Sequence, residues 1–331
     1  MKKIAIFIML LFVVTGCSKN NNSDVKNKIL KGLNNLDSYY LEGDLELRNN
    51  DEVYNYDVNV SFEKKSNFKV SLTNKSNDST QVILKNKDGV YILTPALNRS
   101  FKFQSDWPYN NSQVYLLSAI GNDIKEEKDL SIKKNKNNII LKTKVNYPNN
   151  SNLSYQKIYF DNNYKLKKIV VYDKDDVPCM EFKISKIDYS PSFDKNYFDL
   201  KSIMKTFSLD ESELKETMTL EDSIYPLFLP KNTSLSNEER IKKTNGDRIL
   251  MTFEGDSPFL LVEETANYEE DFTIIPTNGK PFQLMDTLGV MTDNSLNWVS
   301  NGIEYYLVSD VLTTSELIDI AQSIYVLPTM K

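Results

Sequence analysis

The sequence contains two thiols and no imidazole, which limits the chemistry that its side chains can perform. Of the 331 residues, two are cysteine, Cys17 and Cys179, and none is histidine. The absence of histidine excludes Ser-His-Asp and Cys-His nucleophile systems and every histidine-ligated metal site. Cys179 alternates with Met180 and Phe182, so we expect its thiol on the opposite strand face, beside Glu181. Without a base to activate it, a structural or incidental thiol is favoured over a nucleophile.

Three carboxylate clusters are the candidates for metal or acid–base chemistry. Asp173-Lys174-Asp175-Asp176 offers oxygen ligands but lacks the glycine and the distal glutamate of an EF-hand, so we interpret it as a solvated hairpin turn. Glu263-Glu264 and Glu269-Glu270-Asp271 could supply paired carboxylates for acid–base work. They flank a predicted strand end in a charged loop, so solvated carboxylates are the preferred interpretation. With no glycine-rich phosphate loop, the sequence predicts no catalytic residue, no metal and no cofactor.

The first seventeen residues indicate export. Lys2 and Lys3 precede an unbroken apolar run at 4–14, which is shorter than the roughly 20 residues that span a bilayer. A basic start, a short apolar run and a small-residue site are typical of a secretory signal peptide, here residues 1–16. Cys17 after Thr15-Gly16 resembles the bacterial lipoprotein box. The resemblance implies cleavage before Cys17 and transfer of a diacylglycerol to its thiol, whereas an ordinary signal peptide with an incidental cysteine is the alternative.

The charge of the chain bears on how it could meet a membrane or a nucleic acid. The formal net charge is −6, and no basic stripe of the strength that nucleic-acid binding needs is present. An acidic body gains nothing from anionic headgroups, so membrane attachment must come from acyl chains on Cys17. Residues 17–24 are then a lipidated polar tether.

Residues 25–200 carry the pattern of one domain rich in strands. Apolar residues at helical spacing predict a short amphipathic helix over 25–38. Period-two alternation then predicts antiparallel strands from 41 to 184, with a hairpin at Asp88-Gly89 and an inserted helix at 112–120. The apolar face of such a sheet must be covered by helices, a ligand or a partner. The aromatic stripe Tyr54, Tyr56 and Phe62 could line a cavity, although core packing is the preferred interpretation.

The remainder of the chain predicts a linker and a second, smaller domain. Residues 201–222 are charged and are interpreted as a linker helix. Its acidic part at 208–222 is interpreted as a solvated face, and a binding site for a basic partner is the alternative. Residues 223–331 combine short strands, a hairpin at Asn301-Gly302 and a final helix, with Thr313 and Glu316 matching a capping box.

This order of elements resembles the LolA/LolB and RseB/MucB superfamily of envelope proteins. The best local match is "KILKGLNNLDSYYLEGDLEL" at 28–47, and the tail "GIEYYLVSDVLTTSELIDIAQSI" at 302–324 is similar to a small C-terminal domain of Gram-positive membrane-anchored proteins. The whole layout looks most like the germination lipoprotein GerS and its relatives in spore formers. The resemblance implies an α+β fold, in which a LolA-like curved antiparallel sheet, a half-barrel, wraps on helices and a small α+β domain follows.

The function that the resemblance implies is non-enzymatic. We expect a lipoprotein anchored outside the cytoplasmic membrane, in the cell or forespore envelope, which binds and regulates a protein partner. The specific hypothesis is activation of a cortex peptidoglycan amidase in sporulation and germination. The alternative is a carrier or sensor of lipid or lipopeptide, similar to RseB acting on an anti-sigma factor. A third class, a hydrolase with carboxylates from distant strands, would need a convergence that one sequence does not reveal. Only Cys17 matches a motif tightly enough to receive a role, and the partner-binding residues are not identified.

Overall fold

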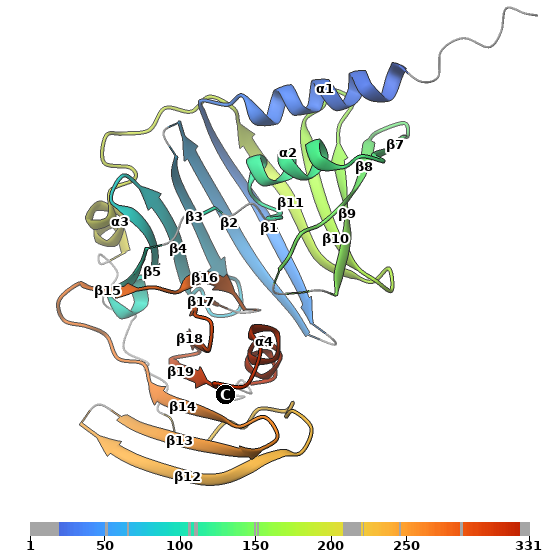
Figure 1. The fold of residues 1–331 in the computed structure, drawn as a ribbon. Helices are drawn as coiled ribbons and strands as arrows, with labels where there is room; N and C mark the ends of the chain where they lie inside the picture. The colour runs from blue at the N-terminus through green and yellow to red at the C-terminus, as the bar shows by residue number, and fades with distance from the viewer. Residues whose placement is uncertain are drawn as a thin grey trace, which may run out of the picture.

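Two sheets and four helices make up the described part of the chain. The computed structural model describes residues 20–49, 52–64, 66–104, 107–108, 112–148, 150, 152–207, 220, 222–244, 246–284 and 287–324. Figure 1 shows a large curved sheet, a smaller sheet below it, and helix α4 between them. Within these residues no helix has both the length and the apolar character to cross a membrane. The predicted signal peptide and Cys17 lie outside the described residues.

The large sheet has twelve strands in the order β15-β6-β5-β4-β3-β2-β1-β11-β10-β9-β8-β7. Its strands are β1 (Ser38–Asn49), β2 (Glu52–Glu63), β3 (Asn67–Asn74), β4 (Thr80–Asn86), β5 (Gly89–Thr94), β6 (Arg99–Phe103), β7 (Ser131–Lys134), β8 (Ile139–Lys144), β9 (Leu153–Phe160), β10 (Leu166–Asp173), β11 (Pro178–Asp188) and β15 (Thr273–Thr277), with a 3₁₀ turn η1 (Pro95–Leu97) before β6. Two antiparallel meanders meet where β1 pairs with β11.

Helices α1 (Asn20–Asn34) and α2 (Leu117–Glu126) cover the concave face of this sheet, as Figure 1 shows. Alternation along β1 turns Leu41, Leu45 and Leu47 into the same buried cluster as Ile29 of α1 and Ile120 of α2. The predicted fold class, α+β with a curved half-barrel sheet wrapped on helices, is confirmed. Helix α1 begins at Asn20, so it includes the end of the predicted tether 17–24.

The inserted helix lies later in the chain than the prediction of 112–120. Leu116 is extended and serves as the N-cap, and α2 runs from Leu117 to Glu126. The backbone N–H of Ser112 donates to the carbonyl of Asn146 at 2.9 Å. This long-range pairing keeps Ser112 out of the helix, and the N–H of Leu116 donates to the carbonyl of Gln113 in a turn that precedes α2.

Helix α3 (Leu200–Phe207) covers the opposite, convex face at β4 and β5. Val82, Leu84 and Leu93 are buried against Ile203 and its neighbours on that side, whereas Ile83 and Ile92 face the concave core. Burial on both faces explains why these two strands have unbroken apolar runs rather than alternation. The predicted linker helix 201–222 is therefore helical at 201–207 and part of the N-terminal module there; residues 208–219 and 221 lie outside the described residues.

The small sheet has seven strands in the order β12-β13-β14-β19-β18-β17-β16, and α4 packs on it. Its elements are β12 (Thr233–Lys243), β13 (Gly246–Gly255), β14 (Phe259–Thr265), β16 (Lys280–Gln283), β17 (Leu288–Met291), β18 (Ser295–Ser300), β19 (Ile303–Val308) and α4 (Thr314–Gln322). The predicted capping box of Thr313 with Glu316 is confirmed. The predicted hairpin is confirmed as well, because Asn301 and Gly302 join β18 to β19 with φ of 48° and 76°.

Three contacts fasten this C-terminal module to the large sheet. Strand β15 leaves the small module and pairs in parallel with β6 at the edge of the large sheet. The side chain of Gln81 on β4 accepts the N–H of Leu288 at 2.6 Å and donates to its carbonyl at 3.1 Å. Arg99 of β6 forms an ion pair with Glu304 of β19. The domain boundaries predicted at residues 200 and 223 stay a prediction. Strand β15 comes after both of them in the chain but belongs to the large sheet.

Candidate binding cavity

A cavity of about 630 Å³ lies between the concave face of the large sheet and the C-terminal module. The N-terminal wall includes Leu45 and Leu47 of β1 and Met180 of β11. The opposite wall comes from the segment around β16 and β17 and from α4. Its apolar residues are Pro281, Phe282, Leu284, Leu288 and Ile318. The period-two alternation of β1 positions its two leucines, because residues i and i+2 point to the same face.

Polar side chains also contribute to the cavity lining. Arg48 and Asn49, at the end of β1, and Gln322, at the end of α4, bring polar groups to one part of the lining. In another part, Ser112 and Tyr147 connect the cavity to a buried polar cluster under α2. A cavity with apolar walls and a few polar groups is the usual form of a small-ligand site.

The polar cluster centres on Asp123 of α2. Gln156 of β9 donates from Nε2 to its Oδ2 at 2.7 Å, and the hydroxyl of Ser112 also hydrogen-bonds its carboxyl group. Burial raises the pKa of Asp123 to about 6, and the two hydrogen bonds oppose that rise only in part. The sequence pattern does not mark Asp123 as a candidate, because a single acidic residue on an amphipathic helix is normally on its exposed side.

Cys179 lies on the cavity wall, contrary to the prediction. Val171 of β10 pairs with Met180 and Tyr172 pairs with Pro178, so Cys179 is the extra residue of a β-bulge. The bulge breaks the alternation, and both Cys179 and Met180 contact the concave core and line the cavity. Burial and the carboxyl group of Asp173 raise the pKa of the thiol. A raised thiol pKa opposes nucleophilic use, in agreement with the expected structural role.

The carboxylate cluster at 173–176 forms the expected hairpin turn, and residues 174–176 are exposed, but Asp173 is buried and lines the cavity rather than being solvated. Oδ1 of Asp173 accepts the backbone N–H groups of Asp175 at 2.9 Å and Val177 at 2.8 Å. These bonds close the turn between β10 and β11. Among the described residues, no group of three or more acidic or cysteine side chains is arranged to hold a metal ion.

Glu263 differs from the expected solvated carboxylate. Its neighbour Glu264 forms ion pairs with Lys243 and Arg248 at the sheet surface, whereas Glu263 is 0% exposed. Alternation along β14 points it inward with Leu261, under the segment that includes Ile224. The N–H of Ile224 donates to its Oε2 at 3.0 Å, and burial raises its pKa to about 7. Alternation with Leu261 is a local signal for an inward side chain, but the burial of Glu263 also depends on the segment at Ile224, which lies 39 residues away in the chain.

The other candidates of the sequence analysis lie away from the cavity. Tyr56 is buried in the concave core, and Tyr54 and Phe62 pack against that core outside the cavity lining, so the core interpretation is confirmed. Glu269 and Glu270 lie in the loop before β15, where their carbonyls accept the side-chain amide of Asn98.

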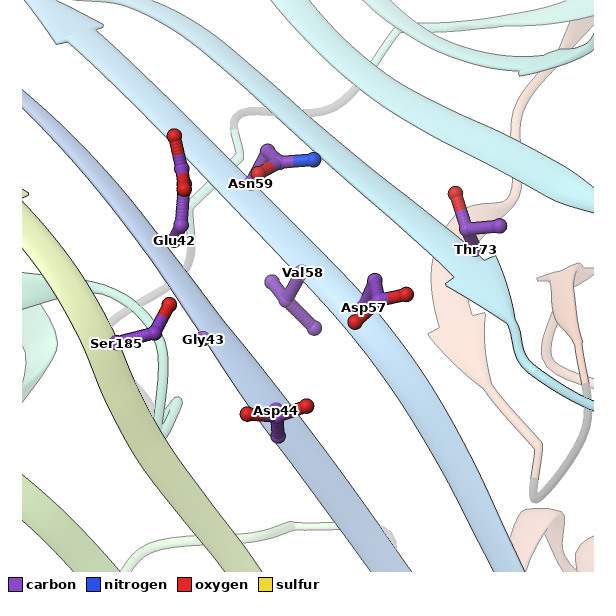
Figure 2. Close-up of a pocket in the computed structure, with 8 residues that line it drawn as sticks. All are labelled: Glu42, Gly43, Asp44, Asp57, Val58, Asn59, Thr73 and Ser185. Carbon is purple, nitrogen blue, oxygen red and sulfur yellow. The ribbon is translucent and has the colours of Figure 1, made fainter.

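A second, shallow hollow lies on the convex face of the large sheet (Figure 2). Its lining is mostly polar: Glu42, Gly43, Asp44, Asp57, Val58, Asn59, Thr73 and Ser185. Lys75 bridges the carboxylates of Asp44 and Asp57, and Lys186 pairs with Glu42. Such exposed ion pairs are each worth at most about 1 kcal/mol, so we interpret this hollow as solvated sheet surface.

A curved open sheet with helices and a cavity on its concave face defines the class of this protein, an α+β half-barrel. The sequence pattern of the family "Sporulation protein YdcC-like" matches residues 1–198. Sporulation protein YdcC of Bacillus subtilis (strain 168) is 31% identical over 317 residues, which cover 96% of this chain and 94% of that protein. The chain therefore belongs to the sporulation protein YdcC-like family.

Solved structures with a similar fold have low sequence identity. The complex of Pseudomonas aeruginosa MucA and MucB matches at 11% identity and a TM-score of 0.33, covering 92% of this chain and 98% of that one. A LolA superfamily protein from Nitrosomonas europaea matches at 12% identity and 0.31, covering 54% and 98%. One chain of the structure of the CwlD amidase from Clostridioides difficile in complex with the GerS lipoprotein matches at 14% identity and a TM-score of 0.20, covering 54% of this chain and 98% of that one.

Proposed function

We propose that this protein is a non-enzymatic binding protein of sporulation whose cavity holds the acyl chain of an amphiphile. One observation carries the proposal: apolar side chains from both modules line a single cavity of about 630 Å³. Small-molecule sites typically have volumes of about 300 to 1,000 Å³ and mostly apolar walls. Burying an acyl chain there contributes roughly 0.8 kcal/mol for each methylene group removed from water.

The same cavity supports a sensor role. A ligand in it touches Leu45 and Met180 of the large sheet on one side and Phe282 and Ile318 of the C-terminal module on the other. A ligand shifts a conformational equilibrium only when it contacts the two states differently. A ligand that contacts both modules would meet that requirement if the modules separated in a second state, because it would lose the contacts with one of them.

A second candidate function is regulation of an envelope protein, with activation of a cortex peptidoglycan amidase as the specific hypothesis. An exposed apolar segment on the C-terminal module favours it. The segment consists of Tyr225, Leu227, Phe228 and Leu229, and Leu227 is 76% exposed. Adjacent exposed apolar side chains of this size are typical of protein contact sites. In both candidates Cys17 would carry the lipid that holds the protein outside the cytoplasmic membrane.

Native mass spectrometry of the protein purified from sporulating cells separates these functions. An added mass of lipid size, lost on substitution of Leu288→Trp in the cavity wall, supports the ligand proposal. A bound protein partner that is still present with Leu288→Trp but is lost with the double change Leu227→Ser and Phe228→Ser supports the regulatory function. If the unchanged protein carries neither a lipid nor a protein partner, although circular dichroism shows that it is folded, both functions are contradicted.

A further inference from the structure

The convex side of strands β7 to β10 carries lysines and tyrosines and no acidic residue. Directly paired residues of neighbouring strands point to the same side, and Lys142 of β8 pairs with Lys157 of β9. Ile158, which alternates with Lys157, is buried in the concave core, so the two lysines face outward. Asp173, the sole acidic residue in these four strands, lines the cavity on the opposite side. The outward residues, which we call the lysine face, are Ser131, Lys133, Ile140, Lys142, Lys144, Tyr155, Lys157, Tyr159, Lys168, Val170 and Tyr172.

The lysine face is well separated from the acidic part of the same convex side. Glu42, Asp44 and Asp57 lie on β1 and β2, as Figure 2 shows. Strands β9, β10 and β11 lie between β8 and β1 in the sheet. At about 4.8 Å per strand, the separation of β8 from β1 is about 19 Å, roughly twice the screening length of about 8 Å in physiological salt. The acidic side chains therefore do little to offset the charge of the lysines.

Three carboxylates lie at the border of the lysine face, and each has a partner there. These partners are Lys168 for Glu181, the hydroxyl of Tyr155 for Asp176, and the backbone N–H of Lys144 for Glu127. At the centre, Lys142 and Lys157 form no ion pair with any described acidic residue. The centre of the face therefore keeps its positive charge, although the chain as a whole carries −6.

Tyrosine rings hold the two central lysines in place. Nζ of Lys142 lies 3.6 Å from the ring centroid of Tyr155, and Nζ of Lys157 lies 4.4 Å from that of Tyr172. The two rings stack on each other, with centroids 4.9 Å apart and an interplanar angle of 11°. The attraction between an ammonium group and an aromatic ring restricts these flexible side chains before any ligand arrives. Less conformational entropy is then lost when the lysines bind an anion.

The lysine face is also open. Among the described residues, the helices that pack on the large sheet do so elsewhere, with α1 and α2 on the concave face and α3 on β4 and β5. Lys133, Lys142 and Lys144 are exposed. An open, positively charged surface on an otherwise acidic protein is suited to attract a polyanion.

The spacing of the lysines selects the kind of polyanion. Lys142 and Lys157 occupy paired positions about 5 Å apart, and Lys142 and Lys144 are two residues apart along β8, about 7 Å. This dense spacing fits a linear polymer with a phosphodiester in every repeat better than a glycan with one carboxylate in two sugars. Lysine also binds phosphate oxygens as a point charge, without the two-point geometry that arginine gives to carboxylates. A flat anionic bilayer would meet a convex sheet only along a narrow line.

We infer that the lysine face is a docking surface for a linear polyanion with a phosphodiester in every repeat. Lys142 and Lys157 neutralise adjacent phosphates at the centre, and Lys133 and Lys144 extend the contact along β7 and β8. This surface and the cavity lie on opposite sides of the sheet, so the inference does not depend on the cavity ligand.

Fluorescence anisotropy of end-labelled poly(glycerol phosphate) tests the inference. The protein, beginning at residue 18 so that every described residue is kept, is titrated at several salt concentrations. We expect the logarithm of the affinity to fall with the logarithm of the salt concentration with a slope of about −3, since four lysines each contribute roughly −0.7. Lys142→Gln with Lys157→Gln should weaken binding about tenfold or more in low salt and reduce the slope by about half.

A matched control separates the lysine face from the general charge of the protein. Lys231→Gln with Lys242→Gln removes the same two charges from exposed positions of the C-terminal module and should leave affinity and slope unchanged. Equal weakening by both double variants, each shown by circular dichroism to be folded, overturns the docking surface. Tighter binding of a hyaluronan oligosaccharide or of phosphatidylglycerol vesicles at equal anion concentration overturns the stated partner. Absence of binding in low salt overturns the inference as well, and the cavity function stands in each case.

Discussion

The guanidinium of Arg99, on the large sheet, lies 2.9 Å from the carboxylate of Glu304, on the small sheet. The Arg99 side chain is 7% exposed and that of Glu304 is 25% exposed, so the pair is largely removed from water at the junction of the two modules. Asn297 also donates to Glu304, at 3.2 Å. Loss of one partner leaves the other with a buried and uncompensated charge, which costs more than loss of the pair.

We therefore expect Glu304→Gln to lower the free energy of unfolding by about 2 to 4 kcal/mol. The value lies at the low end for buried pairs because water reaches Glu304. The double variant Arg99→Met with Glu304→Gln should be more stable than Glu304→Gln alone. Urea unfolding, followed by tryptophan fluorescence and circular dichroism, measures both. A Glu304→Gln protein as stable as the unchanged one would mean that the pair does not hold the modules together.

Glu263 predicts a pH dependence of stability. Its folded-state pKa, about 7, lies above the ordinary 4.5, so the folded protein binds this proton more tightly than the unfolded chain does. The stabilisation is complete below pH 4.5 and declines as the pH rises toward 7. Glu263→Gln should remove the decline and raise the free energy of unfolding by about 3 kcal/mol above pH 7. The pKa of Asp123 is also raised, but Asp123 is present in both proteins. The difference in the free energy of unfolding between the unchanged protein and Glu263→Gln, measured across pH, therefore isolates the contribution of Glu263.

Cys179 offers a direct probe of cavity occupancy. It is the sole cysteine after Cys17 and lies on the cavity wall. Because the pKa of its thiol is raised, alkylation should be slow near neutral pH and faster in alkaline buffer. A bound amphiphile that covers the thiol should slow the reaction in proportion to its occupancy of the cavity, about tenfold when roughly nine-tenths of the protein is occupied. The control is Cys179→Ser with Ser185→Cys, which moves the thiol to the convex hollow of Figure 2 and should react at one rate with or without ligand.

Membrane anchoring is predicted to depend on Cys17. Cys17→Ser should move the protein from the membrane fraction to the soluble fraction of fractionated cells, since an acidic body has no other strong attraction to anionic lipid. Incorporation of labelled fatty acid into the unchanged protein but not the variant is the chemical readout. Membrane association that persists in Cys17→Ser would contradict lipid anchoring at this residue.

Local patterns predicted the elements better than the places where distant segments meet. Period two along β1 and the capping box of α4 are set by neighbouring residues, so both were predicted. The burial of Glu263 and the start of α2 at Leu117 each depend on a partner far along the chain. The bulge at Cys179 lies between consecutive strands, but an alternating pattern alone does not indicate an extra residue there. The cavity itself was predicted only as an apolar sheet face to be covered, because seven of its 27 lining residues come from distant segments after residue 280.

The parallel pairing of β15 with β6 also sets the order in which this protein can be completed. A polypeptide is made from its N-terminus, so residues 99–103 exist long before residues 273–277. Until then β6 is an open edge with unpaired backbone groups, which is the usual starting point of aggregation. Strand β6 becomes an inner strand only when most of the chain has been synthesised, and the five-residue β15 is then the edge strand of the large sheet. A product truncated before β15 would lack part of the small module and would also leave β6 as an exposed edge strand that another chain can extend.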